Sequence, residues 1–262
     1  MEKTSALGDL YAVIEKLTGP DGCPWDREQT PKTLADYVIE ETHELVAAIR
    51  SGNDAEVRDE LGDTLFLLVF IARYYEKKGV FSLRDSLESV SAKMIRRHPH
   101  VFANAKFENL DEQLKAWEKI KKEEKADKKQ GLFAGLPASL PGLVKAYRIN
   151  SKAARVGFTW PEDEEVEQQV ESEWLEWLDA CQQDSRELET HELGDLLFSV
   201  VELGRRKGIK ANEALDLACS RFLKRFAAME GMARQQGRDL ADMSLDEKDE
   251  LWNLAKKQET ES

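Results

Sequence analysis

The residues most suited to chemistry are four carboxylates that flank a short Ser-Gly-Asn break. Two acidic residues spaced three positions apart precede the break and two more follow it: Glu41, Glu44, Glu60 and Asp63. Residues at this spacing share one face of a helix, about 4.5 Å apart along its axis. Two helices folded back on each other about Gly52 would place Glu41 level with Asp63. The same fold would place Glu44 level with Glu60.

Such convergence has a chemical consequence. Neighbouring carboxylates repel one another and lose hydration, so they stay ionised only when a cation joins them. Three or four hard oxygen ligands suit Mg²⁺, with Mn²⁺ as a possible substitute. The pattern therefore predicts a magnesium site between the two helices. The competing interpretation is an ordinary solvated acidic face, which is what one pair of glutamates on a helix usually forms.

The same four residue types recur later in the chain. Each lies 132 positions after its counterpart: Glu173, Glu176, Glu192 and Asp195. The stretch LGDLLF, which begins at Leu193, follows LGDTLF at Leu61 by the same distance. This repetition argues against a solvated face, because surface charge has no reason to keep the spacing. We expect two related domains, 1–128 and 129–262, joined by a linker at about residues 121–136.

Composition and periodicity favour an all-α fold. Charged residues make up 34% and hydrophobic residues 41% of the chain, and 7 Pro and 15 Gly leave room for long helices. The apolar residues from Leu61 to Tyr75 crowd one broad helical face over too long a run for a strand. No alternating pattern typical of strands is found. Each unit is expected to be a small helical bundle built around its antiparallel acidic hairpin.

Charge, hydropathy and cysteine content exclude several classes of function. A net charge of −13 would repel a nucleic-acid duplex. No apolar run approaches the roughly 18 residues that span a membrane. The 3 cysteines are widely spaced and suggest neither disulfides nor zinc, which favours a cytoplasmic location. No glycine-rich phosphate loop is found, so a phosphate ligand would be held by metal and basic side chains.

Basic and aromatic residues suited to such a ligand also recur. Each unit carries three basic residues at positions i, i+3 and i+4 of one expected helix: Lys93, Arg96 and Arg97, then Arg221, Lys224 and Arg225. Each also carries a tryptophan with a lysine four residues later: Trp117 with Lys121, and Trp252 with Lys256. These side chains suit phosphate contacts and stacking on a base. The alternatives are a solvated basic face and ordinary core tryptophans.

The acidic motifs and two further stretches resemble the MazG family of nucleoside triphosphate pyrophosphohydrolases. The matching stretches are EETHE at Glu40, ELGD at Glu60, GCPWDREQT at Gly22 and IRRHPHVF at Ile95. With the tandem arrangement, the resemblance spans nearly the whole chain. It implies an all-α fold, a homodimer, and Mg²⁺-dependent hydrolysis of ribo- and deoxyribonucleoside triphosphates to the monophosphate and pyrophosphate. The resemblance also implies that the protein has a role in housecleaning or regulation of the nucleotide pool.

The resemblance also assigns roles to the acidic residues. It implies that both hairpins supply their four carboxylates as metal ligands. A carboxylate of the first helix of each hairpin would orient or deprotonate the attacking water, and the candidates are Glu41, Glu44, Glu173 and Glu176.

The second unit departs from the family pattern at two positions. Ser172 stands where the first unit has Glu40, and Glu202 stands where family members often carry Asn. This leaves open an alternative in which one or both units bind nucleotide, as sensing or partner-binding modules, without turnover. A third hypothesis is a di-iron carboxylate protein, because Glu40 and His43 have the Glu-x-x-His spacing of such bundles. The first helix of the second hairpin lacks that motif.

Overall fold

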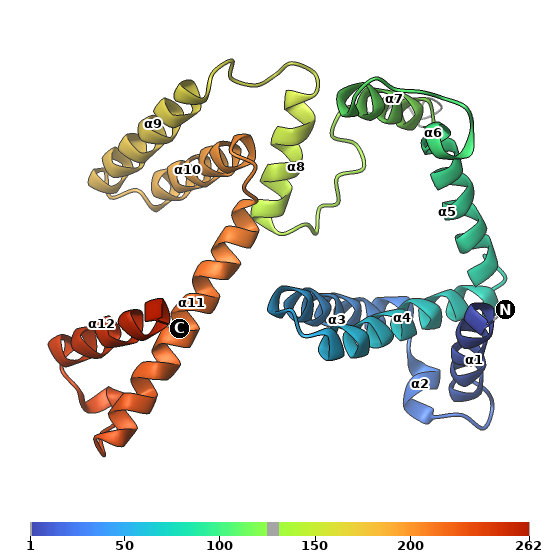
Figure 1. The fold of residues 1–262 in the computed structure, drawn as a ribbon, viewed down its shortest axis with the longest axis horizontal. Helices are drawn as coiled ribbons and strands as arrows, with labels where there is room; N and C mark the ends of the chain where they lie inside the picture. The colour runs from blue at the N-terminus through green and yellow to red at the C-terminus, as the bar shows by residue number, and fades with distance from the viewer. Residues whose placement is uncertain (1, 125–130, 262) are drawn as a thin grey trace. The chain divides into compact units, whose positions relative to one another are not determined.

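The computed structural model describes residues 2–124 and 131–261 and divides the chain into two compact units (Figure 1). The units span Met1–Lys128 and Lys129–Ser262. Within the described residues every regular element is helical, so the predicted all-α class is confirmed. That each unit is an independent domain stays a prediction. Part of the expected linker, residues 125–130, lies outside the described residues.

The helices are numbered along the chain. The first unit contains α1 (Glu2–Leu17), α2 (Pro24–Glu28), α3 (Pro31–Ser51), α4 (Asp54–Lys77), α5 (Leu83–Arg97), α6 (Pro99–Phe102) and α7 (Leu110–Glu123). The second contains α8 (Gly142–Ala154), α9 (Asp163–Gln182), α10 (Arg186–Arg206), α11 (Ala211–Gln235), the 3₁₀ helix η1 (Leu240–Asp242) and α12 (Leu245–Glu261). None of these helices is both long enough and apolar enough to cross a bilayer.

The α3–α4 pair is an antiparallel hairpin with a two-residue connection (Figure 1). Gly52 ends α3 with a left-handed φ of 74°, and its N–H donates to the carbonyl oxygen of Ile49. A side chain at this position would be strained, because L residues rarely adopt that φ. Asn53 then begins α4, since its side-chain oxygen accepts hydrogen bonds from the backbone N–H groups of Ala55 and Glu56. The helix stop and restart therefore follow directly from Ser-Gly-Asn.

The α9–α10 pair repeats this hairpin in the second unit with different turn residues (Figure 1). Asp184 adopts a left-handed φ of 49°, where the first hairpin uses glycine. Aspartate tolerates this conformation better than most residues. The Ser185 hydroxyl then accepts a hydrogen bond from the Leu188 N–H and begins α10. Two unlike sequences thus make the same reversal of chain direction.

The core of the first unit lies where α1 packs against the hairpin. Ile14, Leu34 and Phe70 are among its buried members. At the edge of this core Arg73 on α4 forms an ion pair with Glu15 on α1, with 2.9 Å between Nη2 and Oε1. These contacts hold α4 in place, and α4 carries half of the acidic residues.

A buried carboxylate in the second unit stands where the first unit has an aromatic side chain. Glu202 is 1% exposed and lies 132 positions after Phe70, which is 2% exposed. The Arg205 guanidinium donates a hydrogen bond of 2.7 Å to each oxygen of Glu202. The Thr159 hydroxyl donates another, of 3.3 Å. Glu202 therefore ties the segment before α9 to α10 from within the core.

Replacing Glu202 by alanine is expected to destabilise the second unit strongly. Removing one partner of a buried ion pair leaves the other charge uncompensated, which costs about 3–5 kcal/mol. The Arg205 side chain is 20% exposed, so we expect the lower end of this range. Urea unfolding followed by tryptophan fluorescence should show a clear fall in the midpoint. The matched control is Glu15→Gln, which removes an exposed partner of Arg73 and should cost at most about 1 kcal/mol. Equal shifts for the two variants would contradict a stabilising role for the buried pair.

Candidate functional site

The α3–α4 hairpin brings together three carboxylates of the first unit. One oxygen atom from each of Glu41, Glu60 and Asp63 lies within 4.8 Å of the others. Glu44 lies outside this group of three, but its charge raises the pKa of both Glu41 and Glu60. Glu44 is therefore a neighbour of the group, and three of the four predicted carboxylates converge directly.

Lost hydration and mutual repulsion raise the pKa of two of these carboxyl groups. For Glu41 the largest cause of the raised pKa is lost hydration, followed by the charges of Asp63 and Glu44. The pKa of Glu60 is raised by the same effects, with Glu44 and Asp63 as the main charges. A divalent cation among the oxygen atoms would remove this repulsion. Because every donor is a hard oxygen atom, the group fits Mg²⁺ or Mn²⁺.

The α9–α10 hairpin brings together a corresponding group in the second unit. One oxygen from each of Glu173, Glu176 and Glu192 lies within 4.8 Å of the others. The Gln169 amide donates a hydrogen bond of 2.7 Å to Glu173. The Ser172 hydroxyl donates one of 2.8 Å to Glu176. Ser172, which replaces a glutamate of the first unit, thus orients a carboxylate here.

A hollow of ≈ 420 Å³ opens at this second group. Both helices of the hairpin line it, with Ser172, Glu176 and Asp179 from α9 and Leu188 and Glu192 from α10. Its volume falls in the range of small-molecule sites in proteins. The second acidic group therefore has beside it an open hollow large enough for a small molecule.

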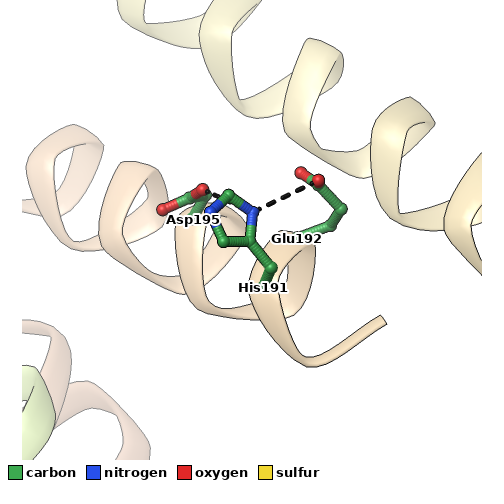
Figure 2. Close-up of side chains that lie close together, drawn as sticks. All are labelled: His191, Glu192 and Asp195. Atoms are coloured by element: carbon green, nitrogen blue, oxygen red, sulfur yellow. Dashed lines mark hydrogen bonds and ion pairs between the residues drawn. The ribbon is translucent and has the colours of Figure 1, made fainter. Parts of the chain in front are cut away.

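The fourth predicted carboxylate of the second unit, Asp195, makes a different contact. Figure 2 shows the imidazole of His191 between Glu192 and Asp195 on α10. The Nδ1 atom of His191 lies 3.3 Å from an oxygen of each. The sequence interpretation assigned no role to His191. The His-Glu-x-x-Asp spacing in the sequence could have predicted this contact, because it places His191 and Asp195 on one face of a helix.

Basic and aromatic side chains meet in the first unit on α5 and α7. The guanidinium carbon of Arg97 lies 5.6 Å from the ring centre of Trp117, a cation–π distance. Arg96 and Arg97 both form ion pairs with Glu124, at 3.0 and 2.6 Å. The hydrogen bond from Arg97 is the largest cause of the lowered pKa of Glu124. This carboxylate holds both guanidinium groups in place.

The second unit repeats this arrangement on α11 and α12. The Arg225 guanidinium carbon lies 5.6 Å from the ring centre of Trp252, and the Lys256 amino nitrogen lies 5.9 Å from the same centre. Arg225 also forms an ion pair of 2.6 Å with Glu259. Trp252 packs in addition against the buried core of this unit, so it has a structural role as well.

The remaining predicted basic residues are less closely grouped. Lys93 is half-buried, whereas Arg221 and Lys224 are exposed. The side chain of Lys121 lies outside the described residues. In the first unit the carboxylates of α4 lie in its first half, whereas the arginines lie at the far end of α5, which runs away from the hairpin (Figure 1). The acidic and basic groups of that unit therefore occupy separate places.

Comparison with known proteins assigns the chain to a family. Residues 29–102, which include the first hairpin, match the model of the MazG nucleotide pyrophosphohydrolase domain. The chain is 40% identical over 248 residues to the nucleoside triphosphate pyrophosphohydrolase/pyrophosphatase MazG of Thermotoga maritima, covering 95% of this chain and 94% of that protein. It is also 40% identical over 256 residues to the nucleoside triphosphate pyrophosphohydrolase of Escherichia coli K12, covering 95% and 97%. The chain belongs to the MazG family.

A third relative is a longer protein, and the part of it that is similar to this chain makes up about half of its length. The protein YabN of Bacillus subtilis is 39% identical over 252 residues, which cover 96% of this chain but 52% of that protein.

Metal addition should stabilise the protein, and the sign of the pH effect follows from the raised pKa of Glu60. A raised carboxyl pKa means that ionising the group destabilises the metal-free fold at pH values above the folded pKa, and that this penalty disappears as pH falls through it. In EDTA at neutral pH, Glu60→Gln should therefore raise the thermal unfolding midpoint, by an amount that shrinks on acidification. With free Mg²⁺ at ten times its Kd the wild type should gain about 1.4 kcal/mol.

The control for this experiment is Glu88→Gln, which removes one partner of an exposed α5 ion pair. It should follow the wild type in both EDTA and Mg²⁺. A magnesium response in Glu60→Gln as large as that of the wild type would contradict metal binding by the first acidic group.

Proposed function

We propose that this chain is a metal-dependent nucleoside triphosphate pyrophosphohydrolase. It converts ribo- and deoxyribonucleoside triphosphates to the monophosphate and pyrophosphate, in the cytoplasm, as housecleaning or regulation of the nucleotide pool. The observation that supports it best is the convergence of three carboxylates in each of two hairpins, in a chain of the MazG family. The names of the relatives from Thermotoga maritima and Escherichia coli agree with this activity.

The proposed metal ligands come from both helices of each hairpin. In the first unit they are Glu41, Glu60 and Asp63 with the adjacent Glu44, and in the second Glu173, Glu176 and Glu192 with the adjacent Asp195. Bound Mg²⁺ would offset the charge of the triphosphate and make a water molecule more acidic. Mn²⁺ has the same preference for carboxylate oxygen and could replace it.

Side chains of the protein supply the catalytic base and hold it in place. Water oxygen forms a bond to the α-phosphorus, the bond from that phosphorus to the α–β bridging oxygen breaks, and pyrophosphate leaves with that oxygen. A carboxylate accepts the proton of the water. Glu44 suits this role in the first unit because it lies beside the group of three without belonging to it. In the second unit the candidates are Glu173 and Glu176, which Gln169 and Ser172 hold in place.

We also propose that the arginine–tryptophan groups bind the substrate. In each unit an arginine lies over a tryptophan and is held by a glutamate, as Arg97 is over Trp117 and Arg225 is over Trp252. Such a group offers a cation to a phosphate and an aromatic face to a base. Lys93, Lys121, Arg221, Lys224 and Lys256 would add positive charge.

A homodimer is the proposed assembly. On α4 the side chains of Leu61, Leu65 and Leu68 are 47%, 41% and 48% exposed, although they repeat at helical spacing. On α10 their counterparts 132 positions later are also exposed: Leu193, Leu197 and Val200. A stripe of apolar residues on an acidic hairpin favours burial against another molecule. The second copy is the partner we propose.

Two single variants and the corresponding double variant should show whether one acidic hairpin or both are needed for activity. Glu44→Gln and Glu176→Gln each remove one negative charge from one hairpin. We expect pyrophosphate release by the double variant to fall at least about 100-fold. The variant lacks both the proposed base of the first unit and one carboxylate of the second acidic site. The loss of pyrophosphate release in each single variant measures how much of the activity its own unit contributes. Release should be measured with mixed nucleoside triphosphates and Mg²⁺, with Glu88→Gln as the control.

Two results would contradict this function. One is release of orthophosphate where pyrophosphate is expected. The other is full activity of the double variant, which would remove the hairpins from the chemistry. Saturable nucleotide binding without any product would instead support the nucleotide-sensing alternative.

The dimer is tested by placing a charge in the apolar stripe. Leu65→Glu and Leu197→Glu should reduce the mass measured by light scattering towards that of one chain, because burying a carboxylate among apolar side chains is unfavourable. Val80→Glu changes an exposed residue after α4 outside the stripe and should leave the mass unchanged. A wild-type mass of one chain would contradict the dimer.

A further inference from the structure

The hollow beside the second acidic group has apolar as well as acidic walls. Leu175 of α9 and Leu188 of α10 line it together with Glu176 and Glu192, which belong to the proposed metal site. Leu175 is 63% exposed and Leu188 is 39% exposed, so this apolar surface is open to a ligand. A ligand with phosphates at one end and a flat, largely apolar group at the other matches these walls.

Two polar side chains line the same hollow towards the turn of the hairpin. Asp179 lies three positions after Glu176 and Gln183 lies seven positions after it, at the C-terminal end of α9. These spacings correspond to about 4.5 and 10.5 Å along a helix axis. The ribose of a nucleoside triphosphate separates its α-phosphate from the edge of its base by a comparable distance. A phosphate at the acidic group would therefore place the base beside Asp179 and Gln183.

Asp179 and Gln183 present hydrogen-bond acceptors to the hollow. The Gln183 amide nitrogen donates a hydrogen bond of 2.9 Å to Oδ2 of Asp179. An ionised carboxylate only accepts hydrogen bonds, so the nitrogen of the amide has to face it and the amide oxygen points elsewhere. The carboxylate has about four acceptor positions on its two oxygen atoms, and one bond from Gln183 fixes its orientation. The matching ligand group is one that donates two N–H bonds side by side.

Guanine is the nucleobase with such an edge. Its N1–H and 2-amino groups are adjacent donors, whereas adenine, cytosine and uracil place a donor next to an acceptor atom. The two oxygen atoms of one carboxylate can accept both guanine donors at once. We propose that the second unit selects nucleoside triphosphates that carry guanine, through Asp179 held by Gln183. The base would pack against Leu175 and Leu188.

The first unit has different residues at all four of these positions. The residues 132 positions earlier are His43, Ala47, Ser51 and Glu56. Ala47, the counterpart of Asp179, has no acceptor atom in its side chain, and the Ser51 hydroxyl donates to the carbonyl oxygen of Ala48. The preference for guanine is therefore expected in the second unit alone.

The tryptophan of the second unit is less open to a base than this hollow. The guanidinium carbon of Arg225 lies 5.6 Å from the ring centre of Trp252, and the amino nitrogen of Lys256 lies 5.9 Å from it. The ring centre of Phe222 lies 5.1 Å away. Neighbouring side chains thus already contact much of this ring, and its cations remain suited to phosphate.

Comparison of guanosine triphosphate with inosine triphosphate tests the proposal, because hypoxanthine differs from guanine only in lacking the 2-amino group. The inference rests on the proposed function, so the measurement is pyrophosphate release by the full-length protein with Mg²⁺. The chain carries Glu44→Gln, which removes the base proposed for the first unit and lets release report on the second. We expect kcat/KM for guanosine triphosphate to exceed that for inosine triphosphate by at least about 10-fold.

Asp179→Asn in the same chain should bring this ratio close to one. The amide that it introduces offers one acceptor and one donor. Xanthosine triphosphate, which has an oxygen atom in place of the 2-amino group, should therefore gain kcat/KM relative to guanosine triphosphate. Loss of a negative charge alone would favour every triphosphate alike and would leave the ratios unchanged.

The matched control is Glu187→Gln, which removes the same charge from an exposed position on α10 outside the lining of the hollow. It should keep the wild-type ratio of guanosine to inosine triphosphate. If Glu44→Gln abolishes release, the same ratios are measured as dissociation constants of the α,β-methylene analogues, which cannot release pyrophosphate.

The outcomes separate this inference from the proposed function. Equal values for guanosine and inosine triphosphate, with metal-dependent pyrophosphate release intact, overturn the guanine preference and leave the proposed function standing. A ratio that survives Asp179→Asn also overturns the role of Asp179. Absence of both turnover and analogue binding in the wild type overturns the inference and the proposed function together.

Discussion

The repulsion among carboxylates held on two packed helices is the constraint on which the rest of the structure depends. Gly52 reverses the chain in the first unit, and the reversal places Glu41 of α3 against Glu60 and Asp63 of α4. Lost hydration is the largest cause of the raised pKa of Glu41, and the charges of Asp63 and Glu44 raise it further. Apolar packing elsewhere in the unit, around Ile14, Leu34 and Phe70, stabilises the helices that carry this group. In the function that we propose, a divalent cation among these oxygen atoms removes their repulsion.

The two units keep this hairpin but vary what surrounds it. Phe70 fills the core of the first unit, whereas Glu202 at the corresponding position forms a buried ion pair with Arg205. Asp59 is held by a neighbouring arginine, whereas His191 faces two carboxylates. Each change alters the charge or the donor type near the hairpin without altering the direction of the helices. The same hairpin is therefore surrounded by different charges in the two units.

The arginine–tryptophan groups place guanidinium groups at two positions in a chain whose net charge is −13. A triphosphate meets repulsion from an acidic protein, so cations have to be concentrated where it binds. We propose that Arg97 over Trp117 and Arg225 over Trp252 are such places, and a glutamate fixes each arginine. Held in this way, the guanidinium groups lose less conformational freedom when a ligand arrives.

Residue spacing alone predicted the helical class, the reversal at Gly52 and the convergence of acidic residues, because these depend on local geometry and on a turn of two residues. Spacing could not decide which carboxylates meet. Glu44 lies beside the group of three and Asp195 turns to His191, since side-chain direction depends on packing between helices. It also could not show that Glu202 is buried, because a glutamate in a helix is ordinarily solvated. Local periodicity determined the hairpins, and contacts between distant residues decided which donors each hairpin presents.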